Sequence, residues 1–278
     1  MLILDLQFFG GRGASSASAS GGGGGSVFAQ NVTSANNNAT SNDDATADDT
    51  TQAQPMSASY DVFMMMSDDD KADYIEQAIQ SGVPVFLANN DYQKFLYNSG
   101  MDIKPQVVDD SVLDSMNGTE IFRTVNFAKD KAHGYTYTAD QIAAQVMKAT
   151  HTRVSDTGGS YYGRGLYFAD SYSASANGYG NTRGNVKLTA VMRGKLNGNA
   201  RIVNINTAQS GLSREINSGS KLGRTLRKMN QKDHWSAVST YALSKGYNVI
   251  SSGDGYLNIL NRNAVTMSAT IKPKGSSW

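Results

Sequence analysis

A segment of low sequence complexity near the N-terminus sets the first limit on what this chain can fold into. From Gly13 to Asn42 all but four residues are glycine, serine, alanine, asparagine or threonine. Such a segment cannot bury enough apolar surface to offset the entropy that ordering it would cost. We therefore expect residues 10–55 to form a flexible tether within a disordered head, residues 1–55. The remaining 223 of the 278 residues are enough for one sizeable core.

Charge is divided unevenly along the chain, although the formal net charge is only +1. Residues 1–70 hold one basic and nine acidic residues, whereas residues 171–278 hold fifteen basic and three acidic ones. This asymmetry indicates a polyanionic or acidic partner for the basic part. Within it, five cations have helical spacing: Lys221, Arg224, Arg227, Lys228 and Lys232. A solvated helix face is the default interpretation of this 221–232 stretch, and contact with an acidic protein or a nucleic acid is the alternative.

Several classes of protein and of site are disfavoured by residue types. The chain has no cysteine, which excludes disulfides, thiolate zinc sites and a cysteine nucleophile. The three histidines show no metal-ligand spacing, so we expect no metal site. The apolar run Leu2 to Phe9 is interrupted by Asp5 and Gln7 and is far shorter than the roughly 18 residues of a membrane span. We expect neither a signal peptide nor contact with a membrane.

Capping residues and apolar spacing predict helices that begin at Ser67, at Thr138 and at about Asp233, the last ending at Gly246. Short β-prone runs predict five strands: 121–125, 166–169, 186–192, 201–205 and 264–271. A hairpin is predicted from 247–251 and 256–260 around the Gly253-Asp254-Gly255 turn. The expected architecture is α+β, with helices early and a mostly antiparallel sheet late.

One local motif carries the strongest functional signal. Gly163-Arg164-Gly165-Leu166-Tyr167-Phe168-Ala169-Asp170 is followed by Ser173, Ser175, Ala176 and Asn177. This block resembles the NAD-binding core of poly(ADP-ribose) polymerases, whose pattern is G-x-G-(I/L)-Y-F-A-D followed by S-x-S-A-N. With the upstream strand that contains Arg123 and the Gly253 to Arg262 segment, the chain is similar to ADP-ribosyltransferase-like proteins of phages and prophages of Gram-positive bacteria. The opening LDLQFFGGRG is similar to the start of proteins from phage head-gene regions.

This resemblance implies a fold and a division into domains. The expected fold is an ADP-ribosyltransferase-like split antiparallel β-sheet, preceded by a small helical lobe. The expected domains are the disordered segment 1–55, the helical lobe 56–118 and the NAD-binding domain 119–278.

The resemblance also assigns roles to individual residues. Arg123 would grip the phosphate and ribose of NAD, Tyr167 would stack on the nicotinamide ring and Ser175 would bind its carboxamide. The implied cofactor-binding residues are Arg123, Gly163, Gly165, Tyr167, Phe168, Ser175 and Tyr179. Tyr179 lies one residue later than the pattern requires and would need a bulge. The two glycines would let the backbone approach NAD closely.

The chain departs from the family at the catalytic glutamate. Its three glutamates, Glu76, Glu120 and Glu215, do not lie on the late strand. Two alignments place either Tyr256 or Asn258 at that position, and Asn258 could bind ribose but could not act as a base. Asp254 is the nearest carboxylate, and Glu215, which we expect in a loop, is the other candidate. The catalytic residues implied are therefore Arg123, Tyr167, Asn258 and Asp254.

Three functions follow as alternatives. The first is a phage mono-ADP-ribosyltransferase that uses NAD to modify a host macromolecule, most readily a protein, in the bacterial cytoplasm. It would use Asp254 or Glu215, or rely on positioning alone. The second is the same fold without transfer activity, acting as an interaction module or a virion-associated protein that binds phage head proteins. The third is transfer of a 2′-phosphate from RNA to NAD, which normally relies on histidines that this chain lacks at Arg123 and Tyr167.

Overall fold

The computed structural model describes residues 58–81, 90–101, 104–128, 162–178 and 186–273, which all belong to one compact unit. The expected head 1–55, the helix predicted at Thr138 and the stacking residue Tyr179 lie outside the described residues. None of the described helices is long and apolar enough to cross a membrane.

The described residues form eight α-helices and eight strands. The helices are α1 (Ala58–Met65), α2 (Asp68–Gln80), α3 (Asp91–Asn98), α4 (Asp110–Ser115), α6 (Tyr172–Gly178), α7 (Ile205–Asn217), α8 (Lys221–Lys232) and α9 (His234–Ser244). The strands are β1 (Gln106–Val108), β2 (Glu120–Ala128), β3 (Leu166–Ala169), β4 (Val186–Leu196), β5 (Ile202–Asn204), β6 (Val249–Ser251), β7 (Tyr256–Ile259) and β8 (Val265–Pro273).

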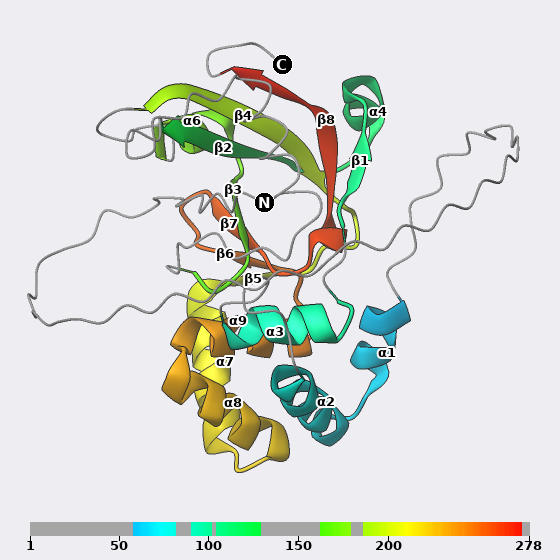
Figure 1. The fold of residues 1–278 in the computed structure, drawn as a ribbon, viewed down its shortest axis with the longest axis vertical. Helices are drawn as coiled ribbons and strands as arrows, with labels where there is room; N and C mark the ends of the chain where they lie inside the picture. The colour runs from blue at the N-terminus through cyan, green and yellow to red at the C-terminus, as the bar shows by residue number, and fades with distance from the viewer. Residues whose placement is uncertain (1–57, 82–89, 102–103, 129–161, 179–185, 274–278) are drawn as a thin grey trace, which may run out of the picture. The chain divides into compact units, whose positions relative to one another are not determined.

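The strands form one mixed sheet in the order β1-β8-β4-β2-β3-β7-β6-β5. The β1–β8 and β5–β6 pairs are parallel, and the other neighbouring pairs are antiparallel. Only one residue pair, Phe122 with Ala169, joins β2 to β3. The sheet is therefore divided at that point into a first half, β1-β8-β4-β2, and a second half, β3-β7-β6-β5 (Figure 1). The α+β class is confirmed. The sheet is mostly antiparallel, as expected, with five antiparallel pairs out of seven among the described strands, and the parallel pairs at its two ends make it a mixed sheet.

Two hydrophobic clusters hold these elements together. One cluster draws on both halves of the sheet: its members include Ile121, Leu166, Phe168, Met192, Ile259 and Met267. The other joins the early helices α1–α3 to the late helices α7–α9 and to the second half of the sheet, through Phe63, Ile75, Phe95, Leu212, Leu226, Val238 and Ile250. The early and late helices therefore share one core, and the described residues of the expected lobe 56–118 and of the expected domain 119–278 belong to the same compact unit.

Local capping explains where α2 and α9 begin. The Ser67 side chain accepts a hydrogen bond from the Asp70 backbone N–H, and Asp233 caps α9 by accepting from the Trp235 N–H. Gly246 follows α9 with φ +82°, a conformation that favours glycine. These two helix starts and the β6–β7 hairpin confirm the sequence predictions.

The expectation that helices come early and strands late is wrong, because α7, α8 and α9 lie between β5 and β6. The predicted loop around Glu215 is instead helix α7. Ile205, Ala208 and Leu212 are buried along one side of it, a helical spacing that serine, glycine and asparagine between them obscure. Glu215 is fixed there, since its carboxylate accepts a hydrogen bond from the Ser220 hydroxyl at 2.6 Å and lies 3.1 Å from Lys245 Nζ.

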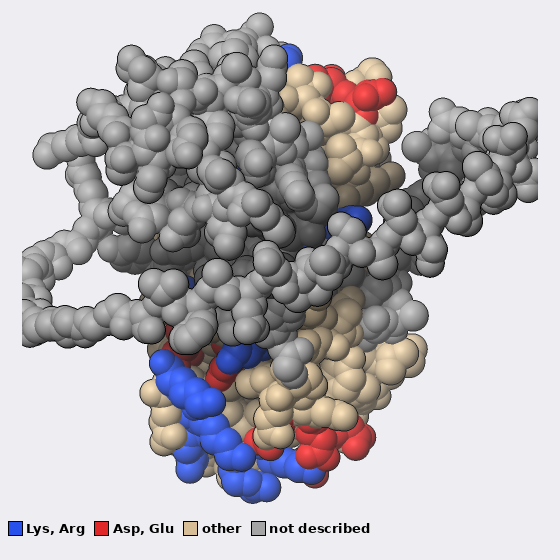
Figure 2. Space-filling view, viewed as in Figure 1, with Lys and Arg blue, Asp and Glu red and all other residues tan. Residues whose placement is uncertain are grey.

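Helix α8 is confirmed as amphipathic, with Leu222, Leu226 and Met229 buried. On the side that faces α2, Lys221 Nζ lies 2.6 Å from Asp73 and Lys228 Nζ lies 2.9 Å from Glu76. Figure 2 shows Lys and Arg side chains in a stripe over the helical end of the molecule, with acidic side chains gathered beside it.

Candidate functional site

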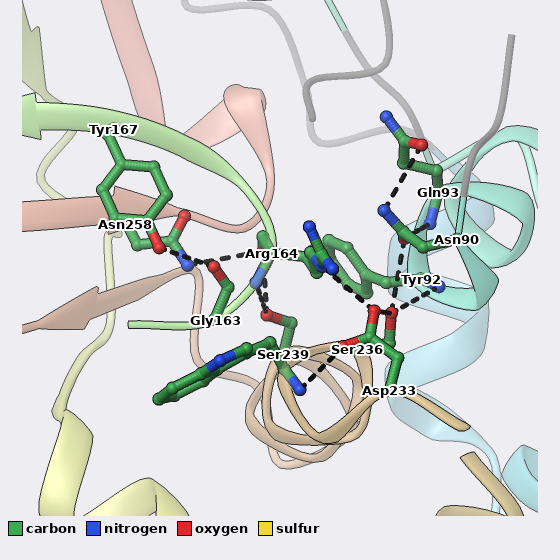
Figure 3. A network of polar contacts seen from close by, with 11 residues as sticks. Asn90, Tyr92, Gln93, Gly163, Arg164, Tyr167, Asp233, Ser236, Ser239 and Asn258 are labelled. Carbon is green, nitrogen blue, oxygen red and sulfur yellow. Dashed lines mark hydrogen bonds and ion pairs between the residues drawn. The ribbon is translucent and has the colours of Figure 1, made fainter. Parts of the chain in front are cut away.

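The Gly163-Arg164-Gly165 turn, which leads into β3, is clamped by two fully buried polar side chains (Figure 3). Ser239 of α9 accepts a hydrogen bond from Arg164 N–H at 2.6 Å and donates one to Arg164 C=O at 2.8 Å. Asn258 of β7 donates through Nδ2 to the carbonyl oxygens of Tyr162 at 2.9 Å and Arg164 at 3.3 Å. The turn is therefore fixed by a helix on one side and by a strand on the other.

Both glycines of the turn are required by this close packing. Gly163 has φ +98°, and a Cβ there would lie 2.6 Å from Ser239 Oγ. A Cβ on Gly165 would lie 2.6 Å from the Ile259 carbonyl oxygen and would also collide with Asn258 Oδ1. The sequence predicts that these glycines admit NAD. In the structure the groups that they admit belong to α9 and β7.

Tyr167 is tied to the same turn. Its hydroxyl donates to Gly163 C=O at 2.6 Å and accepts from Tyr162 N–H at 3.1 Å. In the β3–β7 pair Tyr167 stands opposite Asn258, so both side chains share the face that carries the turn. The ring is half-buried. Its hydroxyl therefore positions the turn, and the ring itself is the part that could contact a ligand.

Arg123 lies close to Tyr167, as expected, but the contact is to the backbone. Arg123 is 5% exposed, and its Nη1 donates to Tyr167 C=O at 3.1 Å. This hydrogen bond crosses from β2 to β3 beside the single residue pair that joins the two halves of the sheet. Arg123 therefore reinforces the junction between the two halves.

Two side chains predicted to contact NAD are buried in the structure. Phe168 is fully buried in the hydrophobic cluster that draws on both halves of the sheet. Ser175, on α6, is also fully buried, with its hydroxyl 2.7 Å from the Thr124 hydroxyl of β2. In this structure Phe168 belongs to the core and Ser175 attaches α6 to the sheet, and their assignment to NAD stays a prediction.

Asn258 is likewise a structural residue in this conformation. It is fully buried, and both of its amide hydrogen bonds hold the turn. Its Oδ1, packed against Gly165, has no hydrogen-bond partner in the described part of the chain. Of the two sequence interpretations, a ribose contact or a turn-stabilising amide, the second describes this geometry.

Asp254 is the carboxylate connected to this cluster. It is exposed in the turn between β6 and β7, and Oδ2 lies 3.4 Å from the Tyr162 hydroxyl, which donates to it. The Ser252 hydroxyl donates to its other oxygen. Tyr162 in turn donates its backbone N–H to the Tyr167 hydroxyl. Asp254 is thus linked to Tyr167 through one intervening residue.

The three glutamates lie elsewhere. Glu76 accepts from Thr225 and Lys228 on the helical side, Glu120 lies 3.5 Å from Arg193 at the start of β2, and Glu215 is held by α7 and Lys245. In a loop, Glu215 could have moved toward the site from the acceptor side. Its place in helix α7 does not fit that movement.

An ion pair between Arg164 and Asp233, which the sequence did not indicate, also holds the Gly163-Arg164-Gly165 turn. Arg164 Nε lies 3.0 Å from Asp233 Oδ2 at the N-terminus of α9, and the Ser236 hydroxyl donates to the same oxygen at 2.7 Å. The sequence marks Asp233 as a helix start, but its pairing with a residue 69 positions earlier is a tertiary contact. No spacing rule would have found it.

The environment of Asp233 lowers its pKa below the ordinary value of 3.8. Burial alone would raise this pKa, but hydrogen bonds from Ser236 and Arg164 and the positive charge of Arg164 outweigh burial. The stabilisation is therefore present above pH 3.8 and is lost as the pH falls through the lowered pKa of the folded state.

Asp233→Asn is expected to lower the free energy of unfolding by about 1–2 kcal/mol at pH 7, because it removes the ion pair with Arg164 and replaces a charged hydrogen bond from Ser236 by a neutral one. The asparagine can still cap α9. The deficit should shrink as the pH falls through the lowered pKa of the wild-type carboxylate, which is then also neutral. Urea unfolding at pH 7 and at a pH below that pKa measures it. Asp109→Asn is the matched control, since Asp109 precedes α4 without a side-chain capping bond. A deficit that is the same at both pH values would contradict the ion-pair account.

Two surface hollows lie apart from the predicted site. Two hollows, one lined by Asp73, Glu76, Gln77, Gln80 and Ser81 and the other by Asn206, Thr207, Ser210 and Arg214, include none of the predicted site residues. The described residues contain no group of three or more His, Asp or Glu placed to hold a metal. Comparisons with protein-family models, curated proteins and solved structures found no match to this chain.

Proposed function

We propose that this chain is a phage-encoded mono-ADP-ribosyltransferase that transfers ADP-ribose from NAD to a host macromolecule in the bacterial cytoplasm and releases nicotinamide. The observation that carries the proposal is the strand order β2-β3-β7. It makes neighbours of the three segments in which the family resemblance predicts site residues. Arg123, Tyr167 and Asn258 come from these strands and meet at the point where the sheet divides.

The burial of the predicted residues narrows the proposed site. Ser175, Phe168 and Asn258 are fully buried and bonded or packed within the protein. Tyr167 and Asp254 keep exposed surface. Arg123 is only 5% exposed and bonds Tyr167 C=O, but it is retained because a guanidinium carries five N–H donors. A guanidinium can form a bidentate pair with phosphate, and a phenol ring can stack on a pyridine ring.

The proposed reaction needs residues that position NAD and one base that takes a proton from the acceptor. Tyr167 would orient the nicotinamide ring and Arg123 would neutralise the charge of the diphosphate as the bond between nicotinamide and ribose breaks. The electron pair of that bond leaves with nicotinamide, and a lone pair of the acceptor forms the new bond to the ribose carbon. Asp254, connected to Tyr167 through Tyr162, would take the proton of the acceptor.

Asp254→Asn is expected to slow transfer to the acceptor about 100-fold, because a lost general base costs at least that much in typical enzymes. Asp69→Asn, an exposed aspartate on α2, is the matched control and should leave the rate unchanged. The rates are measured as radiolabel from adenylate-labelled NAD that is incorporated into protein. Equal rates in the two variants would exclude Asp254 as the base.

The proposal as a whole is tested with the purified full chain, adenylate-labelled NAD and a lysate of the bacterial host. We expect label on a host macromolecule and stoichiometric release of nicotinamide. If neither is produced, the transferase assignment fails.

One observation favours a second candidate, the same fold acting as an interaction module or virion-associated protein without transfer activity. Two side chains predicted to contact NAD, Ser175 and Asn258, are instead used to hold the fold together, and no glutamate lies near Tyr167. Calorimetric titration with NAD separates the candidates. Absence of binding at millimolar NAD would favour the module, whereas the transferase requires binding.

A further inference from the structure

The exposed surface of α7 and α8 has an unusual composition. Residues 205–232, all of which the structure describes, expose five cations: Arg214, Arg224, Arg227, Lys228 and Lys232, which we call the basic face. The other exposed side chains of this segment are serine, threonine, asparagine and glutamine. The one carboxylate in the segment, Glu215, is partly buried and paired with Lys245. No exposed carboxylate of this segment therefore opposes the five positive charges.

Acidic side chains border the basic face on one edge. Carboxylates of α2 and α3 lie along one edge of α8, where Asp73 pairs with Lys221, Glu76 with Lys228 and Asp91 with Lys232. The Lys228 and Lys232 side chains are still 68% and 69% exposed. Figure 2 shows acidic side chains gathered beside the stripe of Lys and Arg. A polyanion would be repelled on the α2 side and attracted along the stripe. Helix α8, with 12 residues, is about 18 Å long, which is the rise of roughly five base pairs of a duplex.

The arginines of the face keep donors for a ligand. Arg224 places Nη1 on Gly219 C=O at 2.6 Å, and Arg227 places Nη2 on Ile216 C=O, both at the corner between α7 and α8. A guanidinium carries five N–H donors, so one such bond anchors the side chain and leaves most of the fork available. Anchored arginines lose less entropy when they bind phosphate.

The neutral residues around the cations favour a nucleic acid over an acidic protein. Protein interfaces centre on apolar and aromatic side chains. The exposed large hydrophobic residues of the described chain, Val62, Met65, Tyr97, Val107 and Ile202, all lie outside α7 and α8. Phosphate backbones, in contrast, are contacted by Arg and Lys together with Ser, Thr, Asn and Gln. That mixture is the composition of this face.

We propose that the basic face binds the phosphate backbone of a nucleic acid without reading its sequence. This binding is independent of the transferase proposal, because no residue of the basic face belongs to the site around Tyr167.

The test is fluorescence anisotropy of the full chain with a labelled 24-base-pair DNA duplex, and separately with a 24-nucleotide RNA, between 50 and 200 mM KCl. If the five cations contact phosphates, duplex affinity should fall about 500-fold over this range, from a slope of about −0.9 per contact. Arg214→Gln/Arg224→Gln/Arg227→Gln leaves two contacts and should reduce the fall to about 10-fold. Lys221→Gln, which removes a charge from the α2 flank of the same helix, should keep the wild-type salt dependence.

The triple variant could also destabilise the fold, because Arg224 and Arg227 donate hydrogen bonds to backbone carbonyl oxygens. A second variant controls for this effect. Arg214→Gln/Lys232→Gln removes two charges of the face without those bonds, and it should lower the salt slope by about 2. Binding of either nucleic acid with these changes supports the proposal, and the tighter probe identifies the form preferred. Absence of binding at 50 mM KCl, an unchanged slope in both variants, or equal affinity for polyglutamate would overturn it. The last result would assign the face to an acidic protein.

Discussion

Gly165→Ala is expected to lower the free energy of unfolding by about 3 kcal/mol, one of the two largest effects that the structure predicts. An added Cβ would lie 2.6 Å from the Ile259 carbonyl oxygen and against Asn258 Oδ1. Neither group can withdraw cheaply, because Ile259 belongs to the β7 backbone and the Asn258 amide holds two carbonyl oxygens of the turn. For a core of this size the melting temperature should fall by roughly 10 °C.

Gly198→Ala provides the control, since a Cβ at Gly198 meets no atom within 4 Å. Its melting temperature should match that of the wild type within about 1 °C. If Gly165→Ala melted at the wild-type temperature, the clamped turn would not have the packing described here.

Arg123→Lys is expected to reduce nicotinamide release about 1000-fold under the proposed function, because a lysine keeps the charge but loses the guanidinium fork. The sequence alone suggests that alanine at position 123 would abolish activity and leave the fold largely intact. The structure argues for the milder lysine, since Arg123 is almost fully buried and its Nη1 bonds Tyr167 C=O beside the β2–β3 junction.

Arg193→Lys is the matched control for this variant. Arg193 is equally buried on the neighbouring strand β4, but it pairs with Asp110 and Asp114 instead of approaching Tyr167. Nicotinamide release by Arg193→Lys should stay within about 3-fold of the wild type. An equal loss of activity in both variants would indicate that buried charge in the sheet, and not the position of Arg123, is what the reaction requires.

Much of the local structure could be predicted from the residues. Ser67 and Asp233 are capping residues followed by helical apolar spacing, and both begin helices. The run Leu166 to Ala169 is strand β3 with the predicted bounds. These signals are local, since each depends on side chains within one or two turns of the chain.

The sequence predictions are wrong for elements whose structure depends on tertiary packing. Helix α7 was hidden by serine, glycine and asparagine, and it is stabilised by Ile205, Ala208 and Leu212 against a cluster assembled from distant helices. The parallel β1–β8 pair joins residues about 160 positions apart, which no hairpin rule predicts.

In the candidate site, too, the local features could be predicted from the sequence, whereas the tertiary contacts could not. The family resemblance assigns Tyr167 and Asn258 to one site, and in the structure these residues stand opposite each other on β3 and β7. It could not show that Asn258 and Ser239 fill the space beside the glycines, nor that Asp233 holds Arg164. Those contacts depend on where α9 packs, and α9 lies roughly 70 residues after the motif.

A crystal structure of the full chain with bound NAD, or with a non-hydrolysable analogue, would test the central claim most directly. The account predicts a nicotinamide ring against Tyr167 and a diphosphate within hydrogen-bond reach of Arg123, at the junction of β2 and β3. Crystals soaked at millimolar concentration that show no ligand there, or a ligand bound on another face of the molecule, would contradict it.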